Sequence, residues 1–300
     1  QLGVKNALAI LASVFRCRRA MRRAKADVLL AMGSYSSLPP VLAARSCGVP
    51  VVLHEANTVP GKAVDFLSRY AVAVATSFGM TARFLPRSRT VPTGLPVRTD
   101  IASGTRFEFI PADAFTVFVT GGSQGAHAVN LLMRDALTML KRELARRADA
   151  RVLYVIHQTG AKDEAGIQEA YAAAGIPARV HAFENAMADA FASADIVVAR
   201  AGASTCFELA ACGKPALLIP LPGALRDHQH HNAEAFAAHG AADEGIQANL
   251  SSLQICRYLL QKHDHPEQLR AMGGRMAALA APDAAAKVAD LVEASAIPRG

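Results

Sequence analysis

Short apolar runs alternate along the chain with longer segments in which apolar residues recur at helical spacing. The runs expected to form strands are 28–32, 51–54, 72–76 and 90–92 in the first part of the chain. In the second part they are 115–120, 152–156, 179–181, 196–199, 216–219 and 241–244. Because strands that alternate with helices build parallel sheets covered on both faces, the pattern predicts two doubly wound α/β domains.

The two parts of the chain also share one local plan. Both "VLLAMGSYSSLPPVLAARSCGVPVVLHE" and "IVVARAGASTCFELAACGKPALLIPLP" contain a strand, a glycine beside small or hydroxylic residues, an alanine-rich helix, Cys-Gly-x-Pro and a second strand. Two such domains would turn the carboxyl ends of their strands, where ligands bind in sheets of this kind, toward one cleft. Residues 98–115 lie between the parts, have no clear period and hold Gly104 and Pro111, which predicts a linker.

The stretch "ARAGASTCFELAACGKPALLIP", residues 199–220, places its smallest residues where a strand meets a helix. With little side-chain bulk at Gly202 and Ala203, a helix that starts near Thr205 would offer free N–H groups to a phosphate or diphosphate. Glu208, one turn later, would then accept hydrogen bonds from ribose hydroxyls. The alternative is structural: Thr205 and Glu208 fit the S/T-x-x-E capping box, and this stretch alone leaves the two interpretations about equal.

Two other junctions carry polar or glycine-rich turns. "GGSQGAHAVN", residues 121–130, is a tight glycine turn that opens a helix, although it fits neither G-x-G-x-x-G nor a Walker A loop. A structural turn is the commoner meaning of such a motif, but a second glycine junction in the same domain favours an extended phosphorylated ligand. In "HEANTVPGKA", His54, Glu55 and Asn57 follow a buried strand, where polar groups suit a site better than a core. The alternative is a capped loop with Pro60 at the start of the next helix.

The composition limits the remaining possibilities. Hydrophobic residues make up 52% of the 300 positions and charged residues 19%, which is typical of a globular protein of about two domains. The five cysteines form no C-x-x-C pair, which favours a reducing compartment. No apolar run approaches the roughly 18 residues that span a bilayer. The chain begins with Gln1 and enters a helical pattern almost at once, so we expect an N-terminal portion to be missing.

The positive charge is concentrated near the N-terminus. The net charge is +7, and six basic residues crowd positions 16–25, just after an apolar stripe at helical spacing formed by Val4, Leu8, Leu11 and Phe15. Such a helix could lie on an anionic membrane surface, although a packed amphipathic helix with a solvated basic end is the more general interpretation. No aromatic residues interleave with the basic ones, so nucleic acid is not expected as a partner.

Histidines in "RDHQHHNA", residues 226–233, raise the question of a metal. His228 and His231 have the spacing that places two ligands on one helical face, whereas His230 does not. No other cysteine or carboxylate has metal-ligand spacing. We therefore expect no metal here, and expect polar side chains that hold sugar hydroxyls instead.

Six segments, in this order, resemble the MurG family of bacterial glycosyltransferases. They are "GSYSSLPPVLAARSCGVPVVLHEANTVPGKA", "GLPVR", "GGSQGAHAVN", "HQTG", "RAGASTCFELAACGKPALLIPLP" and "DHQHHNA", and the resemblance covers nearly the whole chain. It implies a GT-B fold, with an incomplete acceptor and membrane-side domain in residues 1–100, joined by a C-terminal helix within 283–300. A domain that binds UDP-N-acetylglucosamine would occupy residues 101–282.

The resemblance also implies the reaction and its setting. Family members transfer N-acetylglucosamine from UDP-N-acetylglucosamine to the undecaprenyl-linked acceptor lipid I and invert the configuration, so that lipid II forms for peptidoglycan and cell-wall synthesis. The enzyme would act at the cytoplasmic face of the bacterial plasma membrane as a peripheral protein, without a cofactor or metal. Two rivals remain open: a UDP-N-acetylglucosamine 2-epimerase on the same fold, and a fragment that only binds the nucleotide sugar.

Site residues follow from the same resemblance. Residues 203–208 would hold the donor diphosphate and ribose, which adds Ser204, Cys206 and Phe207 to the residues already named. The other implied donor contacts are Asn57, Arg98, Ser123, Asn130, Phe183, Glu184, Arg200 and Gln229, with Phe183 and Glu184 flanking the uracil through their backbone. Tyr35, His54 and Glu55 match positions on which the family relies for catalysis.

Three departures from the family pattern accompany these matches. The glycine-rich loop that carries the histidine usually proposed as general base has no counterpart, because the chain starts downstream of it. Leu95 stands where the family has asparagine in "GNPVR", and Val64 most nearly replaces a second asparagine of the H-E-x-N region. Donor binding is therefore better supported by the sequence than turnover.

Overall fold

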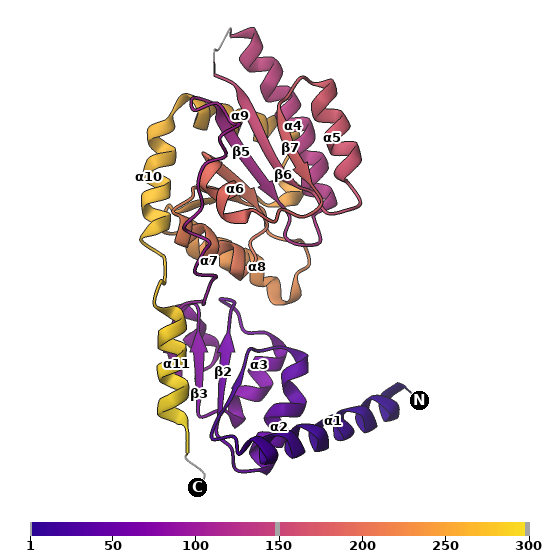
Figure 1. Ribbon diagram of the computed structural model, residues 1–300, viewed down its shortest axis with the longest axis vertical. Helices are drawn as coiled ribbons and strands as arrows, with labels where there is room; N and C mark the ends of the chain where they lie inside the picture. Colours follow the sequence, from indigo (N-terminus) through magenta and orange to yellow (C-terminus); the bar gives the residue numbers. More distant parts are fainter. Residues whose placement is uncertain (1, 148–150, 298–300) are drawn as a thin grey trace. The chain divides into compact units, whose positions relative to one another are not determined.

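The computed structural model describes residues 2–147 and 151–297, and for residues 2–7 the backbone alone. The chain divides into two compact units, each built on its own parallel sheet (Figure 1). Unit 1 comprises Gln1–Pro96, Leu225–His228 and Ala281–Gly300, and unit 2 comprises Val97–Ala224 and Gln229–Ala280. With all ten expected strands present, the prediction of two Rossmann-like domains and a GT-B fold is confirmed.

Unit 1 holds a four-stranded sheet in the order β1-β2-β3-β4, formed by Leu29–Ala31, Val51–Glu55, Ala73–Thr76 and Thr90–Pro92. Its helices are α1 (Leu2–Ala24), α2 (Leu38–Ser46), α3 (Lys62–Leu67) and α11 (Ala284–Ser295), with short 3-10 turns at Tyr35–Ser37, Ser68–Tyr70 and Gly79–Phe84. Alternate residues of β2 face opposite sides of the sheet, as the two-residue period of a strand requires. Leu53 packs toward α2 and α3, whereas Val52 packs against Val288 and Leu291 of α11. The last helix therefore belongs to the core of unit 1.

Unit 2 holds a six-stranded sheet in the order β10-β9-β8-β5-β6-β7. The strands are β5 (Phe115–Thr120), β6 (Leu153–Gln158), β7 (Ala178–His181), β8 (Ile196–Ala199), β9 (Ala216–Leu218) and β10 (Ala242–Glu244). The helices are α4 (His127–Arg146), α5 (Glu164–Ala173), α6 (Met187–Ser193), α7 (Ala203–Cys212), α8 (His228–Ala237), α9 (Ser252–Asp264) and α10 (Pro266–Ala277), with a 3-10 turn at Gln247–Asn249. The 3-10 turn at Leu225–Asp227 and the first residue of α8, His228, are assigned to unit 1.

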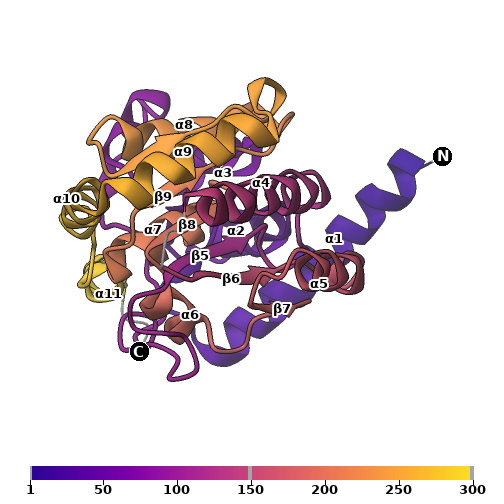
Figure 2. The same cartoon turned by 90° about the horizontal axis from the view of Figure 1, so that it is seen from above.

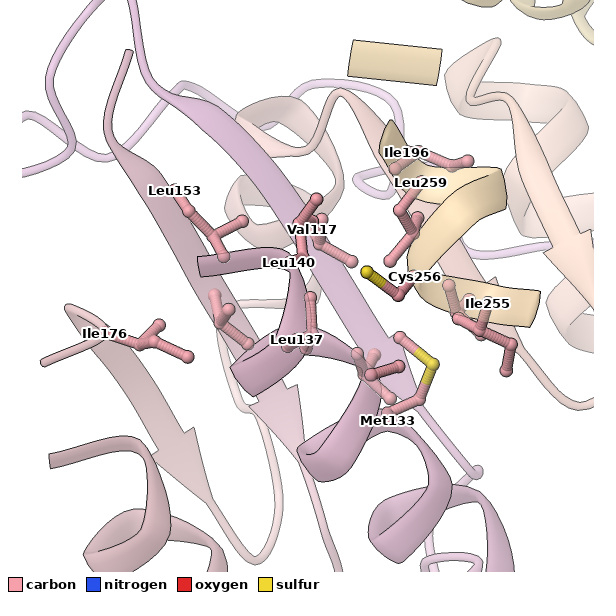
Figure 3. Packing of buried hydrophobic residues seen from close by; sticks show 14 of the residues in the cluster. Val117, Met133, Leu137, Leu140, Leu153, Ile176, Ile196, Ile255, Cys256 and Leu259 are labelled. Atoms are coloured by element: carbon pink, nitrogen blue, oxygen red, sulfur yellow. The ribbon is translucent and has the colours of Figure 1, made fainter. Parts of the chain in front are cut away.

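The core of unit 2 lies on both faces of this sheet. Val117 of β5 packs with Met133 and Leu137 of α4 and with Leu259 of α9, and Figure 3 shows this cluster from close by. The next residue of β5, Phe118, points to the other face and meets Phe191 of α6 edge-on, with the ring centroids 5.5 Å apart. Figure 2 shows α4 and α9 on one side of β5 and α6 on the other. This is the doubly wound arrangement that the alternating pattern predicted.

The expectation of a linker at residues 98–115 was wrong for most of the segment. Residues 97–114 have no regular structure, but they pack onto unit 2, where Ile101 and Ile110 are buried. The side chain of Arg106 donates to the carbonyl of Ser193 at 2.9 Å, and the backbone N–H of Phe107 donates to the Ser193 hydroxyl at 2.9 Å. An aperiodic sequence can thus be ordered by side-chain hydrogen bonds to a neighbouring element, which periodicity does not reveal.

Within the described residues, no helix is both long enough and apolar enough to cross a membrane. The N-terminal helix, α1, extends away from the sheet of unit 1. Its C-terminal part contacts α2 (Figure 1). Met21 packs against the core of the unit, whereas Leu8, Leu11 and Phe15 are exposed. The side chain of Val4, the fourth residue of the expected apolar stripe, lies outside the described residues.

Candidate functional site

Four strand-to-helix junctions of unit 2 lie along one edge of its sheet. Since all the strands are parallel, the turns that follow β7, β5, β8 and β9 emerge at the same carboxyl end. Hydrogen bonds join neighbouring turns. The Arg200 N–H, after β8, donates to the Thr120 carbonyl at the end of β5, at 3.3 Å. Gln158 of β6 bridges the turn after β5 and the turn after β7. The side-chain amide of Gln158 donates to the Gly122 carbonyl at 2.8 Å, while its oxygen accepts from the Glu184 N–H at 3.2 Å. The predicted donor residues of unit 2 are therefore held in one connected edge.

The glycine turn after β5 is tight on one side and open on the other. Gly125 has φ of +72°, and its N–H donates to the Gly122 carbonyl at 3.0 Å. Gly122 has φ of +85°, and a Cβ atom built there would meet nothing within 4 Å. Ser123 at the tip is exposed. The turn leads into α4, whose first N–H groups have no partner inside the helix, so open space and free donors coincide.

A second helix begins directly after β8, and it begins earlier than the sequence predicted. Helix α7 starts at Ala203 with Gly202 as its N-cap, and no side chain caps it. Thr205 is thus the third helical residue and not the cap, so the capping-box interpretation of Thr205 and Glu208 was wrong. A Cβ atom at Gly202 would meet only the Thr205 hydroxyl, at 4.0 Å. The N-terminus of α7 therefore also faces open space.

The first turn of α7 presents some of its side chains and buries others. Ser204 is exposed, Thr205 is half-buried, and Ala203 is buried. Cys206 is buried, and the Phe207 ring packs edge-on against Phe236 of α8 with the ring centroids 5.8 Å apart. The Cys206 N–H donates to the Gly202 carbonyl at 3.0 Å, so the backbone donors that the helix leaves without an internal partner are those before Cys206.

Glu208 carries a half-buried carboxylate with no hydrogen bond or ion pair among the described residues. Burial raises the pKa of Glu208, and the charge of Arg98 offsets this only in part. Arg98 itself is exposed, with its guanidinium 3.7 Å from the carboxylate of Asp100. A partly desolvated carboxylate that makes no internal hydrogen bond is available to accept bonds from a ligand.

Arg200 and Gln229 hold the backbone of the turn that follows β9. The guanidinium of Arg200 is buried and donates to the carbonyls of Ile219 and Pro220 at 3.1 and 2.9 Å and to the Gln247 side chain at 2.7 Å, while its Nε–H has no partner among the described residues. Burial lowers the pKa of Arg200. The side-chain oxygen of Gln229 accepts from the Leu221 N–H at 3.0 Å, which leaves its amide nitrogen available.

The segment after β7 presents one aromatic ring and hides one carboxylate. The Phe183 side chain is 52% exposed. Glu184 is buried and accepts a bidentate pair of hydrogen bonds from Arg179, at 2.7 and 3.0 Å, and a third from the Ala186 N–H. Although burial pushes the pKa of Glu184 upward, these hydrogen bonds outweigh it and the net pKa is lowered. Since its carboxylate is fully engaged, any ligand contact at Glu184 would have to involve its backbone.

In unit 1, Glu55 organises the loop that follows β2. Its buried carboxylate accepts from the Asn57 N–H at 2.9 Å, from the Asn57 amide at 3.2 Å and from the Gly61 N–H at 2.9 Å. Burial raises the pKa of Glu55, and these hydrogen bonds offset the rise only in part. Gly61 is the N-cap of α3, so the carboxylate ties the loop to the start of that helix.

His54 is buried beside this loop and only 1% exposed. Its Nε2 lies 3.3 Å from the Gly94 carbonyl, which must accept, so Nε2 carries the proton. Nδ1 has no hydrogen-bond partner among the described residues. Burial lowers the pKa of His54 and keeps the ring neutral near pH 7. Tyr35, in the turn after β1, is 68% exposed by contrast.

Two histidines of α8, His230 and His231, pair with carboxylates, whereas Nδ1 of His228 lies 2.8 Å from the Leu225 carbonyl. Nδ1 of His230 lies 2.6 Å from Glu244, and Nδ1 of His231 lies 2.9 Å from Glu234. No group of three or more potential metal ligands occurs in the described part of the chain.

Two family models match the chain in succession. Residues 2–76 match the glycosyltransferase family 28 N-terminal domain, and residues 116–288 match the C-terminal domain. A protein from Geobacter metallireducens is 38% identical over 91% of this chain and 74% of its own length. A protein from Gloeothece citriformis is 37% identical over 97% of this chain and 78% of its own length. Both are named UDP-N-acetylglucosamine–N-acetylmuramyl-(pentapeptide) pyrophosphoryl-undecaprenol N-acetylglucosamine transferase. The chain belongs to the MurG family.

Solved structures give the same fold. The crystal structure of MurG from Acinetobacter baumannii matches 96% of this chain and 80% of its own, with a TM-score of 0.78 and 31% identity. A UDP-N-acetylglucosamine 2-epimerase from Neisseria meningitidis matches with a TM-score of 0.66 but only 14% identity, and that likeness shows the fold alone. The chain is therefore a glycosyltransferase of the MurG family, and the epimerase alternative is less well supported.

The residues named from the MurG resemblance fall into two groups in the structure. Ser123, Ser204, Thr205, Glu208, Gln229, Phe183, Asn57, Arg98 and Tyr35 have at least partly accessible side chains. His54, Glu55, Asn130, Glu184, Arg200, Ala203, Cys206 and Phe207 are buried. The side chains of the second group are enclosed by the protein, and the hydrogen bonds of His54, Glu55, Asn130, Glu184 and Arg200 go to other residues of the chain.

Two of the three departures from the MurG pattern, Val64 and Leu95, are core positions. Val64 is buried among the residues that pack beneath β2, and Leu95 is buried as well. An apolar side chain at each place is satisfied by packing and needs no hydrogen-bond partner.

Asn232, which the sequence analysis missed, is buried in α8 and donates to the Ala201 carbonyl at 3.1 Å, next to the N-cap of α7. Its position three residues after Gln229 was the available signal.

Proposed function

We propose that this chain transfers N-acetylglucosamine from UDP-N-acetylglucosamine to lipid I, the undecaprenyl-linked acceptor, and so forms lipid II for peptidoglycan. The observation that carries the proposal is the identity of 38%, spread over 91% of the chain, to an enzyme named for this transfer. Identity at that level, over both units, makes a shared activity the simplest account of the sequence.

The carboxyl edge of unit 2 supports the donor half of this proposal. The diphosphate would lie between the glycine turn and the N-terminus of α7, where two sets of free N–H groups and two helix dipoles favour negative charge. Glu208 would accept from the ribose hydroxyls, since its carboxylate has no partner among the described residues. The uracil would lie beside the Phe183–Glu184 backbone.

The same donors suit the chemical step. The acceptor C4 hydroxyl attacks the anomeric carbon and gives its proton to a general base, the bond from that carbon to the diphosphate oxygen breaks, and UDP leaves with inversion of configuration. N–H groups already aimed at the diphosphate stabilise the charge that grows on it, without any rearrangement during the reaction. Side-chain hydrogen-bond donors at Ser123 and Gln229 would assist.

His54 and Glu55 act in this proposal as positioning groups. A general base must reach the proton that it removes, within about 2.6–3.2 Å or through one water. His54 is 1% exposed and Glu55 is 3% exposed, and the Glu55 carboxylate already accepts three hydrogen bonds. Glu55 instead fixes the loop that carries Asn57, and His54 ties β2 to the Gly94 carbonyl.

The membrane is the proposed site of encounter with the acceptor. A polyprenyl-linked substrate stays in the bilayer, so the enzyme has to come to it. On α1, the exposed side chains of Leu8, Leu11 and Phe15 precede a basic cluster, and Phe15 lines one depression together with four arginines: Arg18, Arg19, Arg22 and Arg23. Apolar contact beside positive charge is the combination that binds an anionic membrane surface. We place the chain on the cytoplasmic face of the plasma membrane as a peripheral enzyme.

A transferase assay tests the proposal directly. The full chain is incubated with radiolabelled UDP-N-acetylglucosamine and a lipid I analogue, and the products are separated by chromatography. Label that moves to the lipid fraction only when the acceptor is present supports the transfer. Calorimetry with UDP on the same sample tests donor binding separately. Conversion of the donor to its 2-epimer without acceptor would favour the epimerase, and UDP binding without either product would indicate a donor-binding protein only.

A further inference from the structure

A buried chain of hydrogen bonds runs beneath the glycine turn of unit 2. The Tyr171 hydroxyl, on α5, lies 2.9 Å from Nδ1 of His157, and Nε2 of His157 lies 3.1 Å from Oδ1 of Asn130. An amide oxygen only accepts, so Nε2 of His157 donates to it and Nδ1 accepts from the tyrosine. Tyr171, His157 and Asn130 are each no more than 1% exposed. Every polar atom of the histidine ring is thereby satisfied in the interior.

The chain of hydrogen bonds ends on Asp163, at the start of α5. The Asn130 amide nitrogen donates to the Thr159 carbonyl at 2.8 Å and to Oδ2 of Asp163 at 2.7 Å. Oδ1 of Asp163 accepts from Nδ1 of His127 at 2.8 Å. The Asp163 side chain is 10% exposed. Burial pushes the pKa of Asp163 upward, but the hydrogen bonds from Asn130 and His127 outweigh it and keep the carboxylate ionised.

One carboxylate thus holds both ends of the first turn of α4. His127 is the first residue of that helix and Asn130 is the fourth. One oxygen of Asp163 accepts a hydrogen bond from His127, and the other accepts one from Asn130. No side chain caps α4 at Ala126, the residue that ends the glycine turn. The direction in which the first N–H groups of α4 point is therefore fixed from the β6–α5 side, through Asp163, and not by a conventional cap.

We propose that Asp163 is a positioning residue for the donor diphosphate, because it orients the glycine turn and the first turn of α4 through His127 and Asn130. This inference rests on the proposed function, since it assumes that the diphosphate binds there. Asp163 touches no substrate. Its effect should fall on the phosphates and not on the nucleoside, whose predicted contacts at Phe183 and Glu208 lie on other junctions.

The test compares UDP with uridine, which lacks the phosphates. Asp163→Asn keeps the shape of the side chain but removes its charge and leaves a single oxygen, which can accept from Asn130 or from His127 but not from both. Glu164→Gln is the matched control, because Glu164 is the next residue and its one ion pair within the described residues is with His181, at 3.9 Å. His127→Ala removes one of the two ties at a half-exposed position and is expected to fold. NMR titrations of the full chain measure both ligands, and thermal melting reports the fold.

The expected result is a loss of UDP affinity of about five- to tenfold in Asp163→Asn, as for one charged hydrogen bond misplaced, with uridine affinity unchanged. His127→Ala should weaken UDP binding by a smaller factor, and Glu164→Gln should leave both ligands alone. Unchanged UDP affinity in Asp163→Asn would overturn the assignment. If that variant does not fold, His127→Ala decides: a selective loss of UDP supports the assignment and unchanged UDP binding overturns it. A wild-type chain that binds neither ligand overturns the proposed function itself.

Discussion

Gly125 lies against Thr159 so closely that a Cβ atom built on the glycine would stand 2.0 Å from the Thr159 carbonyl oxygen. Gly160 interlocks with the same turn, since its Cβ would stand 2.7 Å from the Gln124 carbonyl oxygen. The glycine turn and the "HQTG" segment are therefore two halves of one backbone contact. Both glycines also have positive φ, where other residues are strained.

We predict that Gly125→Ala destabilises the chain by about 3 kcal/mol, because the new methyl group meets backbone that has no room to move. Gly166→Ala is the control. Gly166 lies inside α5, its φ is not positive, and a Cβ there meets nothing within 4 Å, so alanine should stabilise the helix by about 0.5–1 kcal/mol. Urea unfolding of both variants measures the free energies. If both variants changed the free energy of unfolding by similar amounts in the same direction, the contact between Gly125 and Thr159 would not be as tight as described.

Glu208→Gln should weaken UDP binding without destabilising the fold. A charged hydrogen bond to the ribose contributes on the order of 1.5–3 kcal/mol, which corresponds to a loss of affinity of roughly tenfold or more. The carboxylate makes no hydrogen bond among the described residues, so glutamine breaks none. Burial raises the pKa of Glu208 in the folded chain above its value in the unfolded chain. The free energy of unfolding therefore falls as pH rises from the unfolded pKa through the folded pKa. The variant should accordingly be as stable as the wild type at pH 8, or slightly more so.

Calorimetry with UDP and urea unfolding at pH 8 check the two halves of this prediction. Glu169→Gln, at an exposed position of α5, removes the same charge far from the strand ends and serves as the comparison. A Glu208→Gln protein that keeps its UDP affinity and loses stability would mean that the carboxylate has a structural role after all.

His157 predicts an acid-sensitive step in stability. Burial lowers the pKa of His157 to about 3, whereas the unfolded residue titrates near 6.5. Between these values the unfolded chain binds a proton that the folded chain does not, so stability falls as pH decreases from about 6.5 toward 3. Urea unfolding at several pH values should show this decline in the wild type and a shallower one in His157→Gln. The comparison isolates His157, because other groups titrate alike in both proteins. Equal slopes in the two proteins would show that His157 is not the group responsible.

The sequence predicted the strands well because most are short apolar runs between turn residues, and β2, β3, β5, β6, β8 and β9 are buried along their whole length. The start of α7 was misjudged because Thr205 and Glu208 match a capping box, a local rule, while the residue that ends the extended backbone is Gly202. That outcome depends on how β8 delivers the chain to the sheet edge, which no local pattern records. Asp163 escaped notice for a similar reason: its partners, His127 and Asn130, lie more than 30 positions away in sequence.

Buried polar residues were the hardest to interpret from the sequence. His54, Glu55 and Asn130 matched positions on which the MurG family relies, and a polar residue after a buried strand suggests contact with a ligand. In the structure, their hydrogen bonds go to the Gly94 carbonyl, the N–H of Gly61 and the carboxylate of Asp163, among others. A family match identifies residues that matter, but only the packing tells whether they touch the substrate or hold what does.

The final prediction concerns the exposed face of α1. The chain should bind vesicles that contain anionic lipid, and the binding should weaken as salt is added, because each lysine or arginine near the surface contributes roughly 1 kcal/mol through screened attraction. Leu8→Asp/Leu11→Asp should reduce the binding by removing apolar contact. Both side chains are exposed, at 61% and 55%, so the substitution should not unfold unit 1. Ile246→Asp/Leu253→Asp, at exposed positions of unit 2, adds the same charges elsewhere and should bind like the wild type. Vesicle sedimentation with and without anionic lipid decides the matter: binding that ignores lipid charge and both α1 substitutions would rule out docking through this helix.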